Sequence, residues 1–416
     1  MSIVQTDFTL QFYTLPFLSH LFIHKIFISC SRLSSSIKAQ VPFHFLLTTL
    51  KKFMLILVLC VGILGVTTAA ILQLKPFGKM PSGKRLERVE HSPQYRDGKF
   101  HNASPTPMMT GDNATWETLT EFLSSKNTEP PKPIPSVKTD LKALPDSVPT
   151  LVWFGHSGYL LHVDGKNILV DPIFAESIAP VPWFMKSYAG TSVYSVDDLP
   201  PLDAVIITHD HYDHLNYETI TKIIVKTKHF YTALGVGEHL AYWGVDEQNI
   251  TELDWWEKAD ITSSITLTAT PARHFSGRGI VNDKTLWAAF ALKSSQTSVY
   301  IGGDSGYDTH FKTIGEKFGP FDLVMLECGQ YNKKWALIHL MPEETVQASL
   351  DLKATALMPM HWGRFTLASH TWDEPITRLQ ASASAHGLAL CTPLIGEPVR
   401  LRAPYPHTEW WKKVNQ

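Results

Sequence analysis

Six consecutive residues bring four metal-binding side chains into one short stretch: His209, His211, Asp213 and His214. The run from Leu202 to Thr208 before them is apolar and β-branched and predicts a buried strand. The cluster would then lie in a loop at the edge of a sheet. There the imidazoles of His209 and His211 can bind one cation together. Asp213 and His214 are adjacent and must point in different directions, which suits a second cation. The stretch therefore predicts a dinuclear metal hydrolase, with zinc favoured and manganese or iron as alternatives.

The bulk composition excludes several other classes of protein. The 416 residues are 44% hydrophobic and 18% charged, which is typical of a globular chain with a large core. A net charge of −2 gives no general attraction to nucleic acid. The four cysteines lie far apart without a C-x-x-C pair, which excludes a thiolate zinc finger and a dense disulfide framework.

An uncharged apolar run extends from Phe53 to Leu74. As a helix it would be about 33 Å long, enough to cross the hydrocarbon core of a bilayer. Lys51 and Lys52 precede it, and the small residues Thr68 to Ala70 near its end are compatible with signal cleavage. We therefore expect a membrane anchor or an export signal, and a protein of the bacterial cell envelope. A buried soluble helix is the alternative, and the side of the membrane stays open at this point.

The sequence predicts a division of the chain into five segments. Residues 1–52 form a poorly defined N-terminal region, and Met54 raises the hypothesis that translation begins downstream of Met1. Residues 53–74 are the anchor or signal, and residues 75–147 are an extension that contains the proline-rich linker 129–135. From residue 148 to residue 402 the pattern predicts one α/β hydrolase domain, and residues 403–416 form a C-terminal tail.

A dinuclear site needs further ligands, and three candidates follow apolar runs downstream. His274 follows Thr268-Ala269-Thr270, Asp304 lies in a Gly-Asp-Ser-Gly turn, and His361 follows Ala356 to Met360. Their position at strand ends is the reason to group them with the first cluster. The carboxylate of Asp304, among glycines, can bridge two cations.

The order H-x-H-x-D-H, then His, Asp and His resembles the metallo-β-lactamase superfamily over residues 148–401. Within that superfamily the chain is most similar to N-acylphosphatidylethanolamine-hydrolysing phospholipase D and its bacterial relatives, and it also resembles ascorbate-phosphate lactonases. The closer resemblance rests on these motifs: Trp153-Phe154-Gly155-His156, Asp171-Pro172, Pro271-Ala272-Arg273-His274, Gly303-Asp304-Ser305-Gly306-Tyr307, Phe318-Gly319-Pro320-Phe321-Asp322, Pro342-Glu343-Glu344 and His361-Trp362-Gly363.

The resemblance implies an αββα four-layer sandwich, with two zinc ions in a groove at one sheet edge. It implies that one zinc is held by His209, His211 and His274. It assigns the other to Asp213, His214 and His361, with Asp304 as the bridge. Asp213 and Asp304 are the candidate catalytic carboxylates, since two cations that share a water lower its pKa toward neutrality.

Three further residues are candidates for supporting roles. Histidine ligands need their second nitrogen oriented, and Asp171, at the end of a predicted strand, is the candidate partner. His339 matches a histidine that lies near the active site in relatives, which predicts substrate contact. His156 is a candidate lining residue of the groove.

These observations favour a zinc-dependent phosphodiesterase that acts on small or phospholipid-like substrates beside a membrane. A lactonase or other ester hydrolase is an alternative with the same chemistry, and a metal-containing, membrane-tethered binding protein without turnover is an alternative of another class. An oxygen-reducing diiron enzyme is disfavoured, because such relatives carry glutamate where this chain has His211. We expect no nucleic-acid partner, and the oligomeric state is open.

Overall fold

The computed structural model describes residues 43–111, 114–180 and 184–416. The chain divides into two compact units, Met1–Ile71 and Leu72–Gln416. Of the predicted N-terminal region 1–52, residues 1–42 lie outside the described residues.

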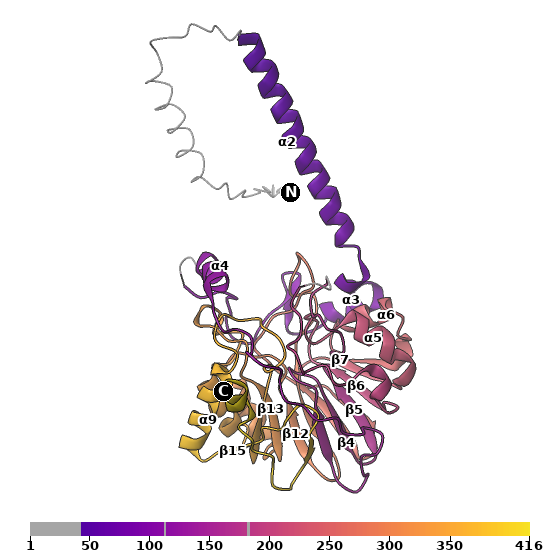
Figure 1. The fold of residues 1–416 in the computed structure, drawn as a ribbon. Helices are drawn as coiled ribbons and strands as arrows, with labels where there is room; N and C mark the ends of the chain where they lie inside the picture. The colour runs from indigo at the N-terminus through magenta and orange to yellow at the C-terminus, as the bar shows by residue number, and fades with distance from the viewer. Residues whose placement is uncertain (1–42, 112–113, 181–183) are drawn as a thin grey trace. The chain divides into compact units, whose positions relative to one another are not determined.

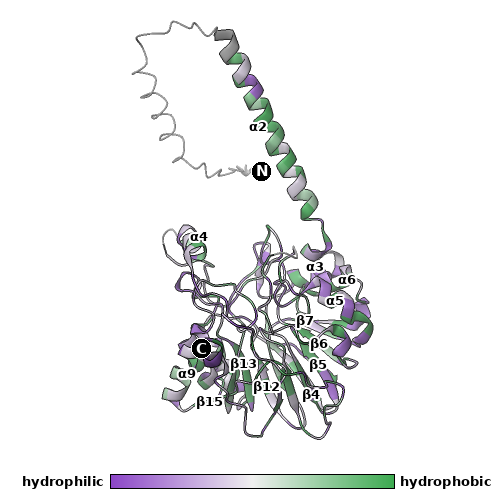
Figure 2. Cartoon of the chain, viewed as in Figure 1, coloured by the Kyte–Doolittle hydropathy of each residue, from purple (hydrophilic) through white to green (hydrophobic). Residues whose placement is uncertain are grey.

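The described part of the first unit is one long helix, α2 (Phe43–Ile71). Its span Leu47–Ile71 is long and apolar enough to cross a membrane by the criteria of length and composition alone. Figure 2 shows hydrophobic residues along most of this helix. Side chains such as Leu55, Leu64 and Val66 are about two-thirds exposed or more.

The apolar helix differs from the predicted span 53–74 at both ends. It begins before Lys51 and Lys52, which are helical, and it ends at Ile71 rather than Leu74. Pro76 explains the earlier end, because its missing N–H and the clash of its ring with the carbonyl of the residue four positions before it prevent the α-helix from continuing through it. Lys75–Phe77 instead forms the short 3-10 helix η1.

Two seven-stranded sheets form the centre of the second unit (Figure 1). The first sheet has, in spatial order, β16 (Pro398–Arg400), β3 (Thr150–Trp153), β4 (Tyr159–Val163), β5 (Lys166–Val170), β6 (Ala204–Ile207), β7 (Phe230–Ala233) and β8 (Ile250–Leu253). The second has β15 (Ala389–Leu390), β14 (Ala356–Met360), β13 (Leu323–Glu327), β12 (Ser298–Ile301), β11 (Ala289–Lys293), β10 (Ile265–Thr270) and β9 (Lys258–Thr262).

Each sheet is antiparallel at one side and parallel at the other. Strands β5 to β8 are parallel neighbours in the first sheet, and β12 to β15 are parallel neighbours in the second. The predicted hairpin joins β4 to β5 through Asp164 and Gly165, both at positive φ, as a two-residue turn requires. In the parallel parts the strands all end at the same edge of their sheet.

Helices cover the sheets, and their apolar sides join one core with the strands. Leu151 and Ile206 of the first sheet and Leu267 and Val324 of the second belong to this core and are fully buried. Helix α6 packs on β8, and α8 and α9 pack on β13 to β15. The arrangement confirms the predicted αββα sandwich.

The remaining elements are short. The helices of the second unit are α3 (Gly83–Glu90), α4 (Ala114–Ser124), α5 (Tyr217–Ile223), α6 (Gly237–Tyr242), α7 (His310–Phe318), α8 (Pro342–Asp351), α9 (Glu374–His386) and α10 (Trp410–Val414). Further 3-10 turns are η2 (Val196–Asp198), η3 (Ile224–Lys226), η4 (Glu247–Asn249) and η5 (Lys333–Trp335), and β1 (Tyr95–Arg96) pairs with β2 (Lys99–Phe100).

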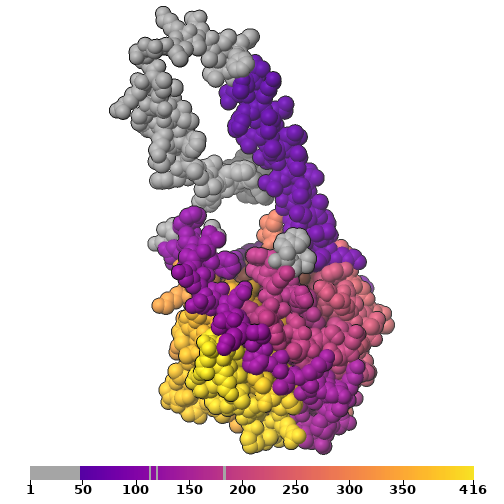
Figure 3. All heavy atoms as spheres, viewed as in Figure 1, coloured from indigo at the N-terminus to yellow at the C-terminus, as the bar shows by residue number. Residues whose placement is uncertain are grey.

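The N-terminal extension packs onto the domain that follows it. Figure 3 shows its purple atoms across the face between the orange-to-yellow and the magenta parts of the second unit. In the proline-rich segment Ile134 is buried, and its backbone N–H donates to Ala189 O. Val137 donates in the same way to Ile395 O. The segment has no helix or strand, as expected of a stiff linker, but it contributes to the surface packing of the domain.

Candidate metal centre

The candidate ligands meet where strands of both sheets end. His209, His211, Asp213 and His214 follow β6 of the first sheet, whereas His274, Asp304 and His361 follow β10, β12 and β14 of the second. The loop after β6 is held by backbone bonds from His214 N and Leu215 N to His211 O. It ends at Asn216, whose side-chain oxygen accepts from Thr219 N and caps α5.

Three imidazoles converge in a first group. His209 Nε2 lies 2.9 Å from His211 Nδ1, and His274 Nε2 lies 3.2 Å from the same atom. His274 Nδ1 donates to Ile338 O at 2.8 Å. Because a carbonyl can only accept, this bond places the proton on Nδ1 and leaves a bare Nε2 in the neutral ring. Three ring nitrogens at such short separations fit a shared cation better than a set of mutual hydrogen bonds.

A second group surrounds Asp213. Its Oδ2 lies 3.0 Å from His361 Nε2 and 2.9 Å from His156 Nε2. His214 donates through Nδ1 to Asp171 Oδ2 at 2.8 Å, which aims its Nε2 into the site. Asp171 is fixed in turn by the backbone N–H and the hydroxyl of Thr208, at 2.9 and 2.7 Å.

Asp304 lies between the two groups. Its Oδ1 is 3.3 Å from His214 Nε2, and its Oδ2 is 3.3 Å from His361 Nε2 and 3.9 Å from both His209 Nε2 and His274 Nε2. The buried atoms His214 Nε2 and Asp304 Oδ1 have no hydrogen-bond partner among the described residues. Buried polar atoms without partners are costly, so this pair indicates a place for a bound cation.

The glycines before Asp304 allow this approach. Gly303 has a φ of +59°, and a Cβ there would lie 2.9 Å from Thr208 Cβ. At Gly302 a Cβ would lie 2.7 Å from Met325 O, so a side chain cannot fit. The non-glycine residues His156, Asp171 and His361 also have positive φ, at 55°, 38° and 64°. Strained backbone of this kind clusters at functional sites.

The electrostatics match a set of metal ligands. Burial lowers the pKa of His209 and of His274 well below the ordinary value of 6.5, so both rings are neutral. Burial raises the pKa of Asp213, but the neighbouring histidines outweigh it and hold that pKa well below the ordinary range, as they do for Asp304. The ionised carboxylates require positive charge nearby, which either protons on the rings or divalent cations can supply.

The chain is similar to a known protein family and to individual known proteins. Residues 166–362 match the Lactamase_B_2 family, described as a beta-lactamase superfamily domain. An uncharacterized protein of Mycobacterium tuberculosis is 39% identical over 332 residues, which cover 78% of this chain and 88% of that protein. The chain belongs to the metallo-β-lactamase superfamily.

Two other proteins are similar to about half of this chain. The N-acyl-phosphatidylethanolamine-hydrolyzing phospholipase D 1 of Caenorhabditis elegans is 31% identical over 234 residues, which cover 52% of this chain and 64% of that protein. A metal-dependent hydrolase of Caldivirga maquilingensis is 26% identical over 217 residues, which cover 52% of this chain and 82% of that protein. With its His/Asp metal-binding site, the chain is a metal-dependent hydrolase of the superfamily.

Sequence reasoning missed Glu327 in this metallo-β-lactamase site. Glu327 ends β13, is almost fully buried, and accepts from Ser305 N at 2.6 Å through Oε1. Its Oε2 lies 2.6 Å from His339 Nδ1 and 3.4 Å from His361 Nδ1. The available signal was an acidic residue at the end of an apolar strand, the same pattern that had pointed to Asp171.

The structure places the three supporting candidates around the ligand cluster. Asp171 contacts His214, as described above. His339 is held by Glu327, with 13% of its side chain exposed. His156 was expected to line a groove, but it is fully buried and contacts Asp213 instead. The reason is its left-handed turn after Gly155, which directs the chain inward so that His156 N donates to Trp362 O.

Proposed function

We propose that the protein is a dinuclear zinc phosphodiesterase of the N-acylphosphatidylethanolamine phospholipase D type, which acts on lipid-like substrates. The observation that carries the proposal is the position of Asp304 between the two histidine groups. Its Oδ1 lies 3.3 Å from His214 Nε2, and its Oδ2 lies 3.3 Å from His361 Nε2 and 3.9 Å from both His209 Nε2 and His274 Nε2. A carboxylate so placed fits two cations better than one. A protein that only binds a ligand would have no physical need for this arrangement.

The chain supplies the ligands in two sets. His209, His211 and His274 would hold one zinc, Asp213, His214 and His361 the other, and Asp304 would join the sets. Two zinc ions held there would lower the pKa of a shared water, so that hydroxide is available near neutral pH. The residues of the chain fix the ligand atoms in place, because Asp171 and Ile338 O each hold the far side of a ligand ring.

His339 is the proposed contact to the substrate. Its Nδ1 faces Glu327, which leaves Nε2 on the other side of the ring, and this side chain is more exposed than those of His274 and His361. The ring lies 5.0 Å from that of His274 and stacks at 5.5 Å on that of His361. A hydrogen bond from this position can orient an oxygen of a phosphodiester beside both metal positions.

Two observations support a lipid-like substrate. The similar C. elegans protein is named for hydrolysis of N-acyl phosphatidylethanolamine. The apolar helix α2 would in addition keep the protein at a membrane or direct it through one. On this basis we propose that the protein is membrane-anchored or exported.

The test is a comparison of substrates with the purified full chain in detergent. Metal content is measured on the sample that is assayed with bis-p-nitrophenyl phosphate, an N-acyl phosphatidylethanolamine and a simple lactone. We expect about two zinc per chain and cleavage of the phosphodiesters. Two zinc with cleavage of the lactone alone would assign the protein to the lactonases, and absence of both metal and turnover would overturn the proposal.

A further inference from the structure

A buried arginine joins the metal-binding loop to the segment that follows helix α2 in the sequence. The metal loop is defined as residues 208–215, and the juxtahelix segment as residues 75–79. Arg278 is 1% exposed, and its Nη1 donates to Asp210 O at 2.5 Å and to Leu215 O at 2.7 Å. Its Nε and Nη2 both donate to Pro76 O, at 3.1 and 2.7 Å. One guanidinium thus binds two carbonyls of the metal loop, at Asp210 and Leu215, and one carbonyl of the juxtahelix segment, at Pro76.

A second connection runs in parallel through side chains. Lys79 N donates to His239 Nδ1 at 3.0 Å, so the proton of the neutral ring must be on Nε2. His239 Nε2 faces Asp210 Oδ2 at 3.3 Å. Asp210 also accepts from Gly277 N at 2.7 Å and from the Thr285 hydroxyl at 2.9 Å. Asp210 lies between the ligands His209 and His211, so this chain of contacts reaches the metal site directly.

The chemistry of Arg278 indicates that its role is positional. It lies 4.2 Å over the ring of Tyr212 and 5.1 Å over the ring of Trp243, and Trp243 donates to Lys75 O. Among the described residues it has no ion pair with a carboxylate. Burial of a charge is costly, and hydrogen bonds to the carbonyls of Asp210, Leu215 and Pro76 offset this cost and fix the positions of these three groups.

We propose that Arg278 is a positioning residue of the metal centre, through which the geometry of the metal loop depends on the juxtahelix segment. This inference depends on the proposed function in one respect, because it assumes that the metal loop is part of the catalytic site. Displacement of residues 75–79 then loosens the ligands His209 and His211 without a change in any ligand.

Gly78 offers a test from the far side of the connection. Its φ is +72°, and a Cβ there would lie 2.0 Å from His239 Nδ1. Gly78→Ala therefore pushes the juxtahelix segment away from His239 while leaving the metal loop untouched. Gly98→Ala is the matched control, because Gly98 has a φ of +73° but the nearest atom to its Cβ would be 3.8 Å away.

The measurements use the full chain in detergent, loaded with Co²⁺. The rate of Co²⁺ loss to a chelator and the visible absorption spectrum report the ligand geometry, and a thermal melt reports stability. We expect Gly78→Ala and Arg278→Lys to lose Co²⁺ at least about tenfold faster than the parent protein, with an altered spectrum. Gly98→Ala should match the parent protein in both respects.

A second control separates local geometry from general stability. Arg85 is an arginine with a 10% exposed side chain that pairs with Glu238 and Glu252, at 2.6 and 2.7 Å. Among the described residues it makes no hydrogen bond or ion pair with the metal loop. Arg85→Lys should lower the melting temperature without changing Co²⁺ loss. Equal rates for Gly78→Ala and Gly98→Ala, or an unchanged spectrum in Arg278→Lys, would overturn the inference. A parent protein that binds Co²⁺ but cleaves no phosphodiester would overturn the proposed function and leave this inference standing.

Discussion

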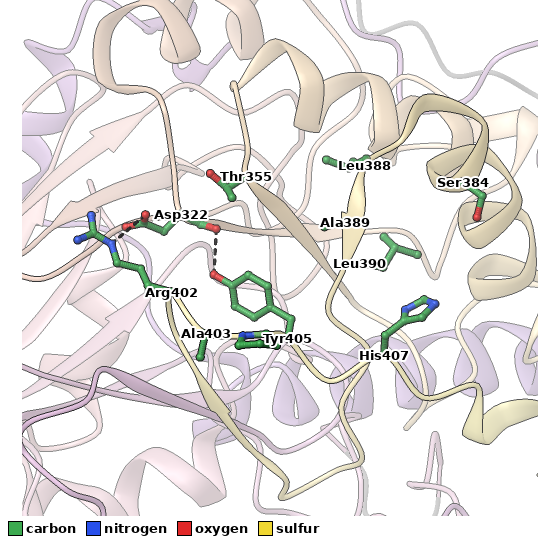
Figure 4. Close-up of a pocket in the computed structure, with 11 residues that line it drawn as sticks. Asp322, Thr355, Ser384, Leu388, Ala389, Leu390, Arg402, Ala403, Tyr405 and His407 are labelled. Carbon is green, nitrogen blue, oxygen red and sulfur yellow. Dashed lines mark hydrogen bonds and ion pairs between the residues drawn. The ribbon is translucent and has the colours of Figure 1, made fainter.

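The two ends of the parallel strands differ sharply in character. At the carboxyl ends lie the buried histidines and carboxylates, with polar atoms that lack hydrogen-bond partners among the described residues. At the amino ends lies a cavity of about 720 Å³, lined by residues that directly precede β13, β14 and β15, such as Asp322, Thr355 and Leu388 (Figure 4). There Asp322 accepts from Arg402 through its side chain and from the Tyr405 hydroxyl through its carbonyl.

The size of a cavity therefore does not by itself locate the chemistry. The carboxyl edge has tightly packed ligand atoms that need a cation, whereas Asp322 at the amino edge already has its partners. The strained residues His156, Asp171 and His361 also belong to the carboxyl edge. Each of the following predictions tests whether function is confined to that edge.

The largest effect is expected for Asp304→Ala. Loss of the carboxylate between the two histidine groups should lower turnover at least about 100-fold, since changes in partners that only orient ligands already cost about 10- to 100-fold. Turnover and bound metal are measured together, and circular dichroism checks the fold. Asp322→Ala, a carboxylate at the amino edge, is the control and should retain turnover. Similar losses in the two variants would remove the distinction between the edges.

A smaller loss of turnover is expected for Glu327→Gln. Glutamine keeps an oxygen for Ser305 N but removes the negative charge beside His339 and His361. We expect kcat to fall about 10- to 100-fold, with a smaller change in KM and with partial loss of bound metal. Steady-state kinetics and metal analysis check this, and unchanged kcat would show that Glu327 does not support the site.

The pH dependence of stability should also originate at the carboxyl edge. Burial lowers the pKa of His310, at the start of α7, to about 4, whereas the unfolded chain has the ordinary value of 6.5. The unfolded state therefore binds more protons between these values, and the free energy of unfolding falls as the pH falls from 6.5 to 4, by up to about 3 kcal/mol. Denaturant melts should show a flatter dependence in His310→Gln.

His229 provides the comparison at the other edge. It directly precedes β7, and burial lowers its pKa, but it is only partly buried and faces the Thr251 hydroxyl at 2.8 Å. His229→Gln should change the same pH profile less than His310→Gln does. A larger change for His229 would contradict the assignment of acid sensitivity to the carboxyl edge.

The smallest effect is expected for Arg402→Ala. The Arg402 side chain is 60% exposed and pairs with Asp322 at 3.0 Å. Exposed pairs contribute little, so the free energy of unfolding should change by less than about 1 kcal/mol, with unchanged turnover. Thermal melts and the phosphodiester assay check this. A loss of turnover would assign a function to the cavity of Figure 4.

The fold and the clustering of the candidate ligands could be predicted because both depend on local patterns. An apolar run followed by His, Asp or a glycine turn marks a strand end, and parallel strand ends share an edge. The burial of His156 could not be predicted, because it depends on a left-handed turn against Trp362. The contacts of Glu327 with His339 and of Arg278 with Pro76 could not be predicted either, because each joins residues that no local sequence pattern connects.

The division of ligands between the sheets has a consequence for assembly. His209, His211, Asp213 and His214 follow the first sheet, and His274, Asp304 and His361 follow the second. A cation bound by both sets would act as a cross-link between the two halves of the sandwich. The shared core and the pairing of β16 with β3 already join the two halves, so the bound cation would add a third link, and its loss would make the sheets easier to separate.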